Sequence, residues 1–303
     1  GAFGIGQDRA QWLSTGALAA MTIAMLLNDW MIRSFGQRRT FVGALGVFVA
    51  SLMLAGLSPN ESVLIFCRIV QGAVAGLLQP LSMYTLFRVF PPARRGSAMG
   101  LFGISVILGP ALGPTVGGIL IEHFNWRYVF FVAVPFSAVG MLLGSVFMPE
   151  REETGRRASF DWTGFLLMST ALASVLIGLS NGQREGWYSG TILILWGLAI
   201  TAAVAFLAWE LYVPQPLVNL KVLTNGRFAA AAAVAAIFGA GLFGSVYLVP
   251  LFVQTIQHLT PLEAGLLLMP AGVALALFFP IGGYMSDRLP ARGLTSAAKS
   301  RLF

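Results

Sequence analysis

The chain has 303 residues, of which 57% are hydrophobic and only 10% are charged. An ordinary soluble domain carries about 25% charged residues, so these side chains are too few to cover the surface of a soluble protein of this size. The net charge of +7 does not indicate a nucleic-acid partner, because the Lys and Arg residues gather in short loops between apolar segments. The single cysteine, Cys67, excludes a disulfide framework and a cysteine-built metal site within one chain.

Uncharged runs long enough to cross a bilayer recur along the whole chain. A transmembrane helix needs about 20 mainly apolar residues, and nine segments meet that need. In chain order they are residues 10–28, 40–60, 62–87, 96–121, 128–149, 162–183, 186–209, 228–257 and 264–286. The sequence therefore predicts an all-α polytopic membrane helix bundle. It opens with neither a cleavable signal peptide nor a methionine, so we expect a fragment of a longer protein.

Positive charges are spread unevenly over the loops that join these segments. With the first residue placed outside, only Arg9, Arg127 and Arg184 fall in outside loops, and Arg68 lies within a span. The rest of the 19 Lys and Arg residues then fall inside. Since cytoplasmic loops carry the excess of Lys and Arg, the pattern predicts a multi-pass protein of the cytoplasmic membrane. Its N-terminus would lie outside and its C-terminus inside.

Arg68 is the only charged residue within a predicted span. A charge in a helix core costs about 2.5–3.5 kcal/mol, so such a residue usually faces a cavity or a partner. Helical spacing places Gln71, Gln79 and Ser82 on the same face, with Gly72 between them. This pattern predicts a polar stripe along an inner cavity. The alternative is an arginine that extends its side chain to the outer membrane surface.

The stretch "GISVILGPALGPTVGGIL", residues 103–120, combines helix-weakening residues with membrane-spanning length. Gly109, Gly113 and Gly117 recur every four residues and therefore share one helix face. Small residues at that spacing allow close helix packing in lipid. Pro110 and Pro114 remove backbone donors and can bend the helix. The spacing favours a tightly packed, bendable helix, although an ordinary small-residue contact would explain it too.

Several ordered motifs carry a family resemblance. "GPALGPTVGG", with Gly109, Pro110, Gly113, Pro114, Gly117 and Gly118, resembles the antiporter signature of the major facilitator superfamily. "NWRYVFFVAVP" (125–135) is similar to a stretch of its fourteen-helix drug/proton antiporters, the EmrB/QacA-like group, with Ala133 where that group usually has Asn. "RIVQGAVAG" (68–76) and "PPARRGSAMG" (91–100) resemble its fourth-helix motif and the loop that follows it.

The resemblance implies a domain organisation. The nine spans would be family helices two to ten, so the first helix and the last four would be absent. Residues 1–148 would form the N-terminal transporter half, 149–227 a linker with two extra central helices, and 228–303 the start of the C-terminal half. The polar stretch "PEREETGRRASFD" (149–161) would be the inter-domain linker.

Two loops resemble the family's cytoplasmic gating loop. In "NDWMIRSFGQRR" (28–39) the matching or replaced positions are Asp29, Arg33, Gly36 and Arg38. Asp29 stands where a glycine is usual and Arg33 where an acid is usual, and the two could pair at the i, i+4 spacing. The alternative for this loop is a simple cytoplasmic cluster of positive charge. "GGYMSDRLPAR" (282–292) keeps Gly283, Asp287 and Arg288 but has Pro290 where a glycine is expected. Paired copies are typical of repeat-built transporters.

One further helix face is a candidate substrate contact. Phe243, Tyr247 and Gln254 fall on one side of the span 228–257. Aromatic and amide groups suit amphipathic or cationic organic molecules. The same face could equally pack against another helix.

The resemblance implies proton-coupled export of hydrophobic or cationic drug-like compounds by alternating access, with Arg68 linked to proton transfer. The partners would be a small-molecule substrate, protons, the lipid bilayer and a periplasmic adaptor protein. No cofactor motif and no catalytic constellation are visible, so an enzyme is not expected. No predicted span contains a buried Asp or Glu, and the acids are expected at span ends and in loops. The resemblance implies an acidic residue in the first family helix, which would be absent here, as the proton carrier. The alternatives are an exporter of an endogenous lipid, siderophore or amino acid, and a non-transporting sensor or scaffold.

Overall fold

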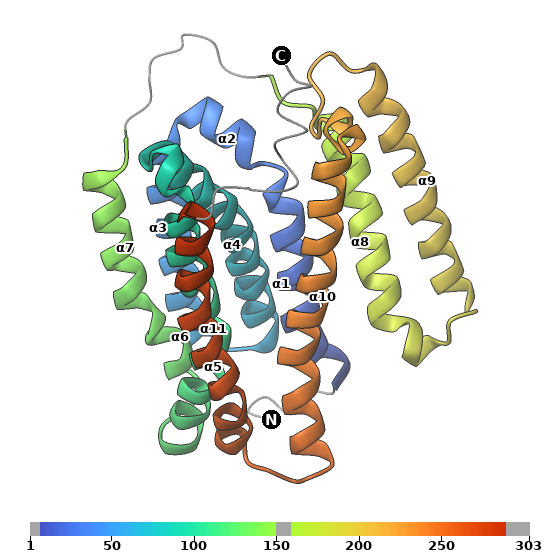
Figure 1. Ribbon diagram of the computed structural model, residues 1–303. Helices are drawn as coiled ribbons and strands as arrows, with labels where there is room; N and C mark the ends of the chain where they lie inside the picture. Colours follow the sequence, from blue (N-terminus) through green and yellow to red (C-terminus); the bar gives the residue numbers. More distant parts are fainter. Residues whose placement is uncertain (1–6, 150–158, 289–303) are drawn as a thin grey trace. The chain divides into compact units, whose positions relative to one another are not determined.

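The computed structural model describes residues 7–149 and 159–288, and the regular elements in those ranges are helical. The α-helices are α1 (Gln7–Met25), α2 (Asn28–Phe35), α3 (Gln37–Gly56), α4 (Glu61–Val89), α5 (Arg95–His123), α6 (Tyr128–Phe131), α7 (Ala133–Phe147), α8 (Trp162–Glu185), α9 (Gly190–Tyr212), α10 (Gly226–Thr255) and α11 (Pro261–Arg288). Two short 3-10 helices, η1 (Pro92–Arg94) and η2 (Leu220–Thr224), lie in the connections (Figure 1). The prediction of an all-α bundle is confirmed.

Each predicted span coincides with one helix or with two consecutive ones, because the long apolar runs leave few places where a helix could end. The first span is α1, and the short helix α2 follows it at a bend of 54°. The fifth is interrupted at Val132, between α6 and α7. Within the described residues, seven helices are long and apolar enough to cross a membrane, or eight if α1 and α2 count as one span.

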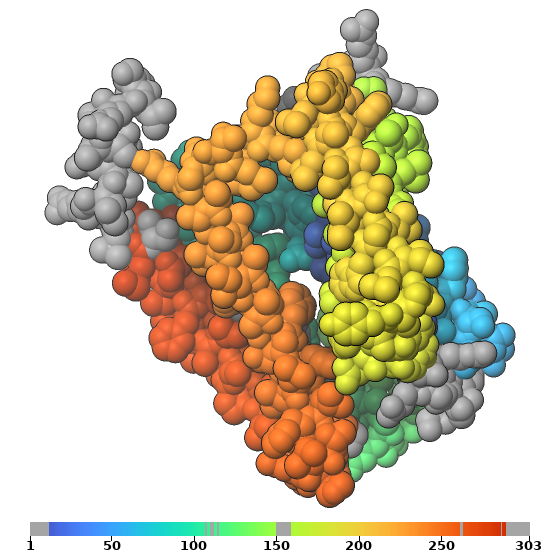
Figure 2. Space-filling view, turned by 90° about the vertical axis from the view of Figure 1, so that its right-hand side faces the viewer, coloured from blue at the N-terminus to red at the C-terminus, as the bar shows by residue number. Residues whose placement is uncertain are grey.

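Large apolar side chains lie on the surface of these helices. On α9, Ile194, Ile200 and Leu211 are 71%, 64% and 72% exposed, and Figure 2 shows the outward face of this helix as a continuous surface. A soluble protein rarely exposes apolar patches of this extent, whereas a bilayer solvates them. The chain is therefore a multi-pass membrane protein.

The chain divides into two compact units, and each is built from two separated stretches. Unit 1 comprises Gly1–Leu81 and Phe130–Val234, and unit 2 comprises Ser82–Val129 and Ala235–Phe303. In unit 1, α3 packs on α7, and α8 packs on both α1 and α9. In unit 2, α5 packs along α11 (Figure 1). Most of the predicted linker lies outside the described residues, and the predicted division into transporter halves stays a prediction.

Small residues bring the helices of unit 1 together. A Cβ on Gly72 would overlap the backbone carbonyl of Ala17, and a Cβ on Gly76 would overlap that of Met21. The backbones of α4 and α1 are therefore in direct contact, which is how helices gain packing energy in lipid. Cys67, on α4, is 1% exposed and acts as a small packing residue in this unit.

Candidate functional site

In unit 2, glycines allow α5 to lie directly against α11. A Cβ on Gly100 would stand 2.8 Å from the carbonyl oxygen of Phe279 and 2.9 Å from the Cα of Pro280. A Cβ on Gly96 would stand 2.5 Å from the carbonyl oxygen of Gly283. These separations are shorter than van der Waals contact, so both positions require glycine while the two helices keep this spacing.

The glycines of the predicted antiporter motif lie further along α5. A Cβ on Gly109, Gly113 or Gly117 would meet no described atom within 4 Å, whereas Gly118 is buried. The helix continues through Pro110 and Pro114 without a break. The predicted contact of this glycine face with another helix stays a prediction.

Sequence reasoning missed the glycines that do make a close helix contact. Gly96, Gly100 and Gly103 are spaced by four and three residues, which places them on one face of α5. Gly103 lies against the ring of Phe279 on α11. The spacing alone could have indicated this face, but it could not have identified α11 as the partner.

Asp287 joins the end of α11 to the start of α5. Its Oδ1 accepts a hydrogen bond of 2.7 Å from the Gly96 amide. Its Oδ2 accepts one of 2.7 Å from the Ser97 amide and one of 2.6 Å from the Ser97 hydroxyl. Amides at a helix N-terminus lack partners within the helix, and a negative charge there is stabilised by the helix dipole. Hydrogen bonds from the hydroxyl and amide of Ser97, with one from Gly96, hold the pKa of Asp287 below its usual value.

The other members of the second gating loop lie beside this contact. Gly283 faces Gly96, and a Cβ on Gly283 would overlap the Gly96 carbonyl. The Arg288 guanidinium lies 4.6 Å from the centre of the Tyr284 ring, within the range of a cation–π interaction. Pro290 and the rest of the predicted loop fall outside the described residues.

The first gating loop contains the short helix α2. Arg33 and Asp29 form the predicted i, i+4 ion pair, in which both side chains are exposed. Gly36 separates α2 from α3 with φ of 83° and ψ of 162°, a conformation that essentially only glycine adopts. Thr40 fixes this turn, because its hydroxyl donates a hydrogen bond of 2.8 Å to the Gly36 carbonyl. Arg38 is half-buried in the first turn of α3.

Arg68 lies half-buried on α4, next to a buried amide. Its Nη1 donates to the Gln71 Oε1 at 3.4 Å, and the Gln71 Nε2 donates at 3.4 Å to the Ser51 carbonyl on α3. Gln71 and Ser51 are 5% and 6% exposed. The guanidinium is thus held at one end of a polar chain that joins α4 to α3.

The other predicted site residues are more dispersed. Gln79 is exposed on α4, and Ser82 is the first residue of unit 2. On α10, Phe243 and Tyr247 are 59% and 66% exposed, and Gln254 is exposed as well. Their role as a cavity wall stays a prediction.

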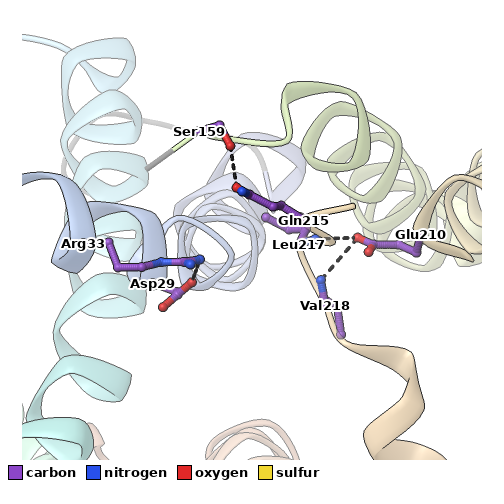
Figure 3. Close-up of polar contacts among 7 residues, drawn as sticks. All are labelled: Asp29, Arg33, Ser159, Glu210, Gln215, Leu217 and Val218. Carbon is purple, nitrogen blue, oxygen red and sulfur yellow. Dashed lines mark hydrogen bonds and ion pairs between the residues drawn. The ribbon is translucent and has the colours of Figure 1, made fainter. Parts of the chain in front are cut away.

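A second polar cluster gathers the connections of unit 1 around α2, and sequence reasoning did not find it. The ring centres of Trp30, on α2, and Phe160 lie 5.2 Å apart. Ser159 donates a hydrogen bond to the Gln215 side chain, so the connection after α9 is joined to the segment before α8. Figure 3 shows both contacts of the 215–218 segment, with Ser159 on one side and Glu210 on the other.

Glu210 closes this cluster from the last turn of α9. Its Oε1 accepts hydrogen bonds of 3.1 Å from the Leu217 amide and 3.2 Å from the Val218 amide (Figure 3). The residue is 6% exposed. An acid at the end of this span agrees with the prediction that the acids lie at span ends, but its burial was not predicted. The helix runs three residues beyond its predicted end at 209, and the chain then folds back over the carboxylate.

Asp161 organises the neighbouring helix end. It is the N-cap of α8, and its Oδ1 accepts from the Gly164 amide at 2.9 Å. The indole Nε1 of Trp209, on α9, donates to both oxygens of the same carboxylate, at 2.9 and 3.1 Å. The ends of α8 and α9 are thus tied by a charged group.

Comparisons with known proteins agree with this architecture. Residues 1–299 match the family model described as the Major Facilitator Superfamily. The chain is 31% identical over 96% of its length to the uncharacterized MFS-type transporter YhcA of Bacillus subtilis, of which it covers 55%. It is 33% identical over 94% of its length to a multidrug resistance protein B homolog of Mycobacterium tuberculosis, of which it covers 53%. It is 29% identical over 98% of its length to the multidrug export protein EmrB of Haemophilus influenzae, of which it covers 58%. The chain thus spans little more than half the length of each of these relatives.

Proposed function

Because the chain belongs to the major facilitator superfamily, we propose that the transporter it forms exports hydrophobic or cationic drug-like compounds across the cytoplasmic membrane in exchange for protons. The membership makes the chain part of a transporter and not of an enzyme. The substrate class is supported by relatives that are named for multidrug resistance and multidrug export.

The observation that carries the mechanism is the contact between Asp287 and the first turn of α5. Alternating access requires contacts that form in one state and break in the other. Three hydrogen bonds from the N-terminus of α5 to the carboxylate of Asp287 provide such a contact. They are short, and they lie beyond the end of the apolar span at Met285. In the proposed cycle this contact closes the cytoplasmic side.

Arg68 is the residue that we assign to proton coupling. Its guanidinium donates a hydrogen bond to Gln71, and the Gln71 amide donates one to the Ser51 carbonyl on α3. A change in the protonation of an acid near Arg68 would change the hydrogen bonds from Arg68 to Gln71 and from Gln71 to Ser51, and with them the contact between α4 and α3.

The Gly/Pro stretch of α5 supplies the open helix face that another helix of the transporter would cover. We place the N-terminus outside by the charge pattern of the loops, and a periplasmic adaptor would bind on that side.

The test is dye efflux from cells that express the full-length gene, with and without a protonophore. Arg68→Ala is compared with Phe66→Ala, which alters an exposed apolar side chain of the same helix. We expect efflux that the protonophore abolishes and that Arg68→Ala, but not Phe66→Ala, reduces by at least about tenfold, which corresponds to about 1.4 kcal/mol in the rate-limiting barrier. Wild-type efflux that continues in the presence of the protonophore would contradict proton coupling.

A further inference from the structure

Glu210 is an acid whose surroundings satisfy only half of its carboxylate. Oε1 accepts two backbone amides, from Leu217 and Val218. Oε2 is buried, and no described residue offers it a hydrogen bond. A buried polar atom without a partner is costly, and a buried charge without one is more costly still. The surroundings of Oε2 therefore make a negative charge on this carboxyl costly.

The charged groups around Glu210 do not compensate for its charge. From the start of α8, Asp161 is close enough for its own negative charge to act on Glu210. The segment 213–219, which covers the carboxylate, contains no charged residue. On α2, Arg33 is paired with Asp29, and both line the small pocket shared with Asp161 and Leu217. None of the described cations forms an ion pair with Glu210.

We propose that Glu210 is a proton-binding site at the end of α9. A hydronium ion from the solvent gives its proton to Oε2, so that one O–H bond forms on the carboxyl, one breaks in the hydronium, and water leaves; no bond of the protein breaks. The unpaired buried charge is then removed, while Oε1 keeps its two amide partners. The carboxyl would be neutral in the folded chain when the 217–218 turn is closed over it, and ionised when water reaches it.

Proton binding to Glu210 can change the position of α2, the helix of the first gating loop, through a series of contacts. The turn that covers Glu210 includes Gln215, which is bonded to Ser159. The next residue, Phe160, packs on Trp30 of α2. Opening of the 215–218 segment would therefore disturb the packing of α2 through two successive contacts, Gln215 with Ser159 and Phe160 with Trp30. The coupling to α2 rests on the proposed proton-coupled export and adds a step to it. Proton binding at Glu210 does not depend on that proposal.

The experiment is pH-dependent infrared difference spectroscopy of the purified full-length protein in lipid nanodiscs, without substrate. We expect a band of protonated carboxyl groups that grows as the pH falls. In Glu210→Gln this band should be weaker than in the wild type by the intensity of one carboxyl group. Glu122→Gln, which alters an exposed acid at the end of α5, should leave the contribution of Glu210 to the band in place. Identical difference spectra for the wild type and Glu210→Gln would overturn the proposal.

A conservative variant protects the test against misfolding. Glu210→Asp keeps an acid but shortens it by one methylene, so the carboxyl no longer reaches both amides in the same way. We expect the midpoint of the band to shift, and an unchanged midpoint would count against the site. The outcome is separable from that for the proposed function: a band assigned to Glu210 in a protein without proton-driven efflux would refute the exporter and leave the proton site.

Discussion

Asp287 makes the polar contact between α11 and the start of α5 with a single side chain. Its carboxylate accepts three hydrogen bonds from two consecutive residues of α5, and these bonds favour its ionised form. A carboxyl with a lower pKa in the folded than in the unfolded state adds stability that is fully present above the unfolded-state pKa. That stability is lost as the pH falls through the folded-state pKa.

We therefore expect Asp287→Asn to lower the melting temperature of the purified protein at neutral pH. The difference from the wild type should shrink as the pH falls below the ordinary aspartate value of 3.8, because the wild-type carboxyl then becomes protonated as well. Thermal unfolding followed at several pH values measures this. Ser97→Ala removes one of the three donors and should give a smaller effect with the same pH dependence. A difference that stays constant down to the lowest pH would contradict the role of the charge.

At the scale of elements, α5 presents two glycine faces with different surroundings. One face, with Gly96 and Gly100, touches the backbone of α11. The other, with Gly109, Gly113 and Gly117, meets no described atom within 4 Å. The first face should serve the stability of unit 2. The second should serve a contact that the transporter makes during its cycle.

A matched pair of substitutions separates these roles. Gly100→Leu forces atoms into the backbone of α11, and overpacking of this kind typically costs about 1–3 kcal/mol, occasionally more. We expect a lower melting temperature and less folded protein in the membrane. Gly113→Leu meets free space within unit 2 and should insert and fold normally, yet abolish efflux by blocking close approach of another helix. Retained efflux in Gly113→Leu, or equal stability of both variants, would show that the two faces do not differ in this way.

At the scale of the whole molecule, the membrane orientation is the property that the loop charges predict most directly. We expect Tyr188→Cys, between α8 and α9, to react with a membrane-impermeant thiol reagent in intact cells. Val222→Cys, in η2, should react only after the cells are permeabilised. Both residues are exposed, at 90% and 40%, and Cys67→Ser provides the background. The reverse pattern would invert the topology.

The sequence predicted the helices well, because a bilayer forces apolar runs of about 20 residues to be helical. It predicted the Asp29–Arg33 pair for a similar reason, since that pair depends on helical spacing alone. It did not predict the partner of Asp287 or the burial of Glu210. Both depend on where a distant segment lies: α11 against α5, and the 217–218 turn over α9. Local patterns carry no information about such contacts.

The residues that join α5 to α11 have a consequence for biosynthesis. Gly96 and Asp287 are separated by 191 positions in the chain. At about 5–20 residues per second, a ribosome needs on the order of 10–40 seconds to produce α11 after α5 has entered the membrane. During that interval the amides at the start of α5 and its glycine face lack the partners that α11 supplies in the finished structure. The assembly of unit 2 is thus paced by translation.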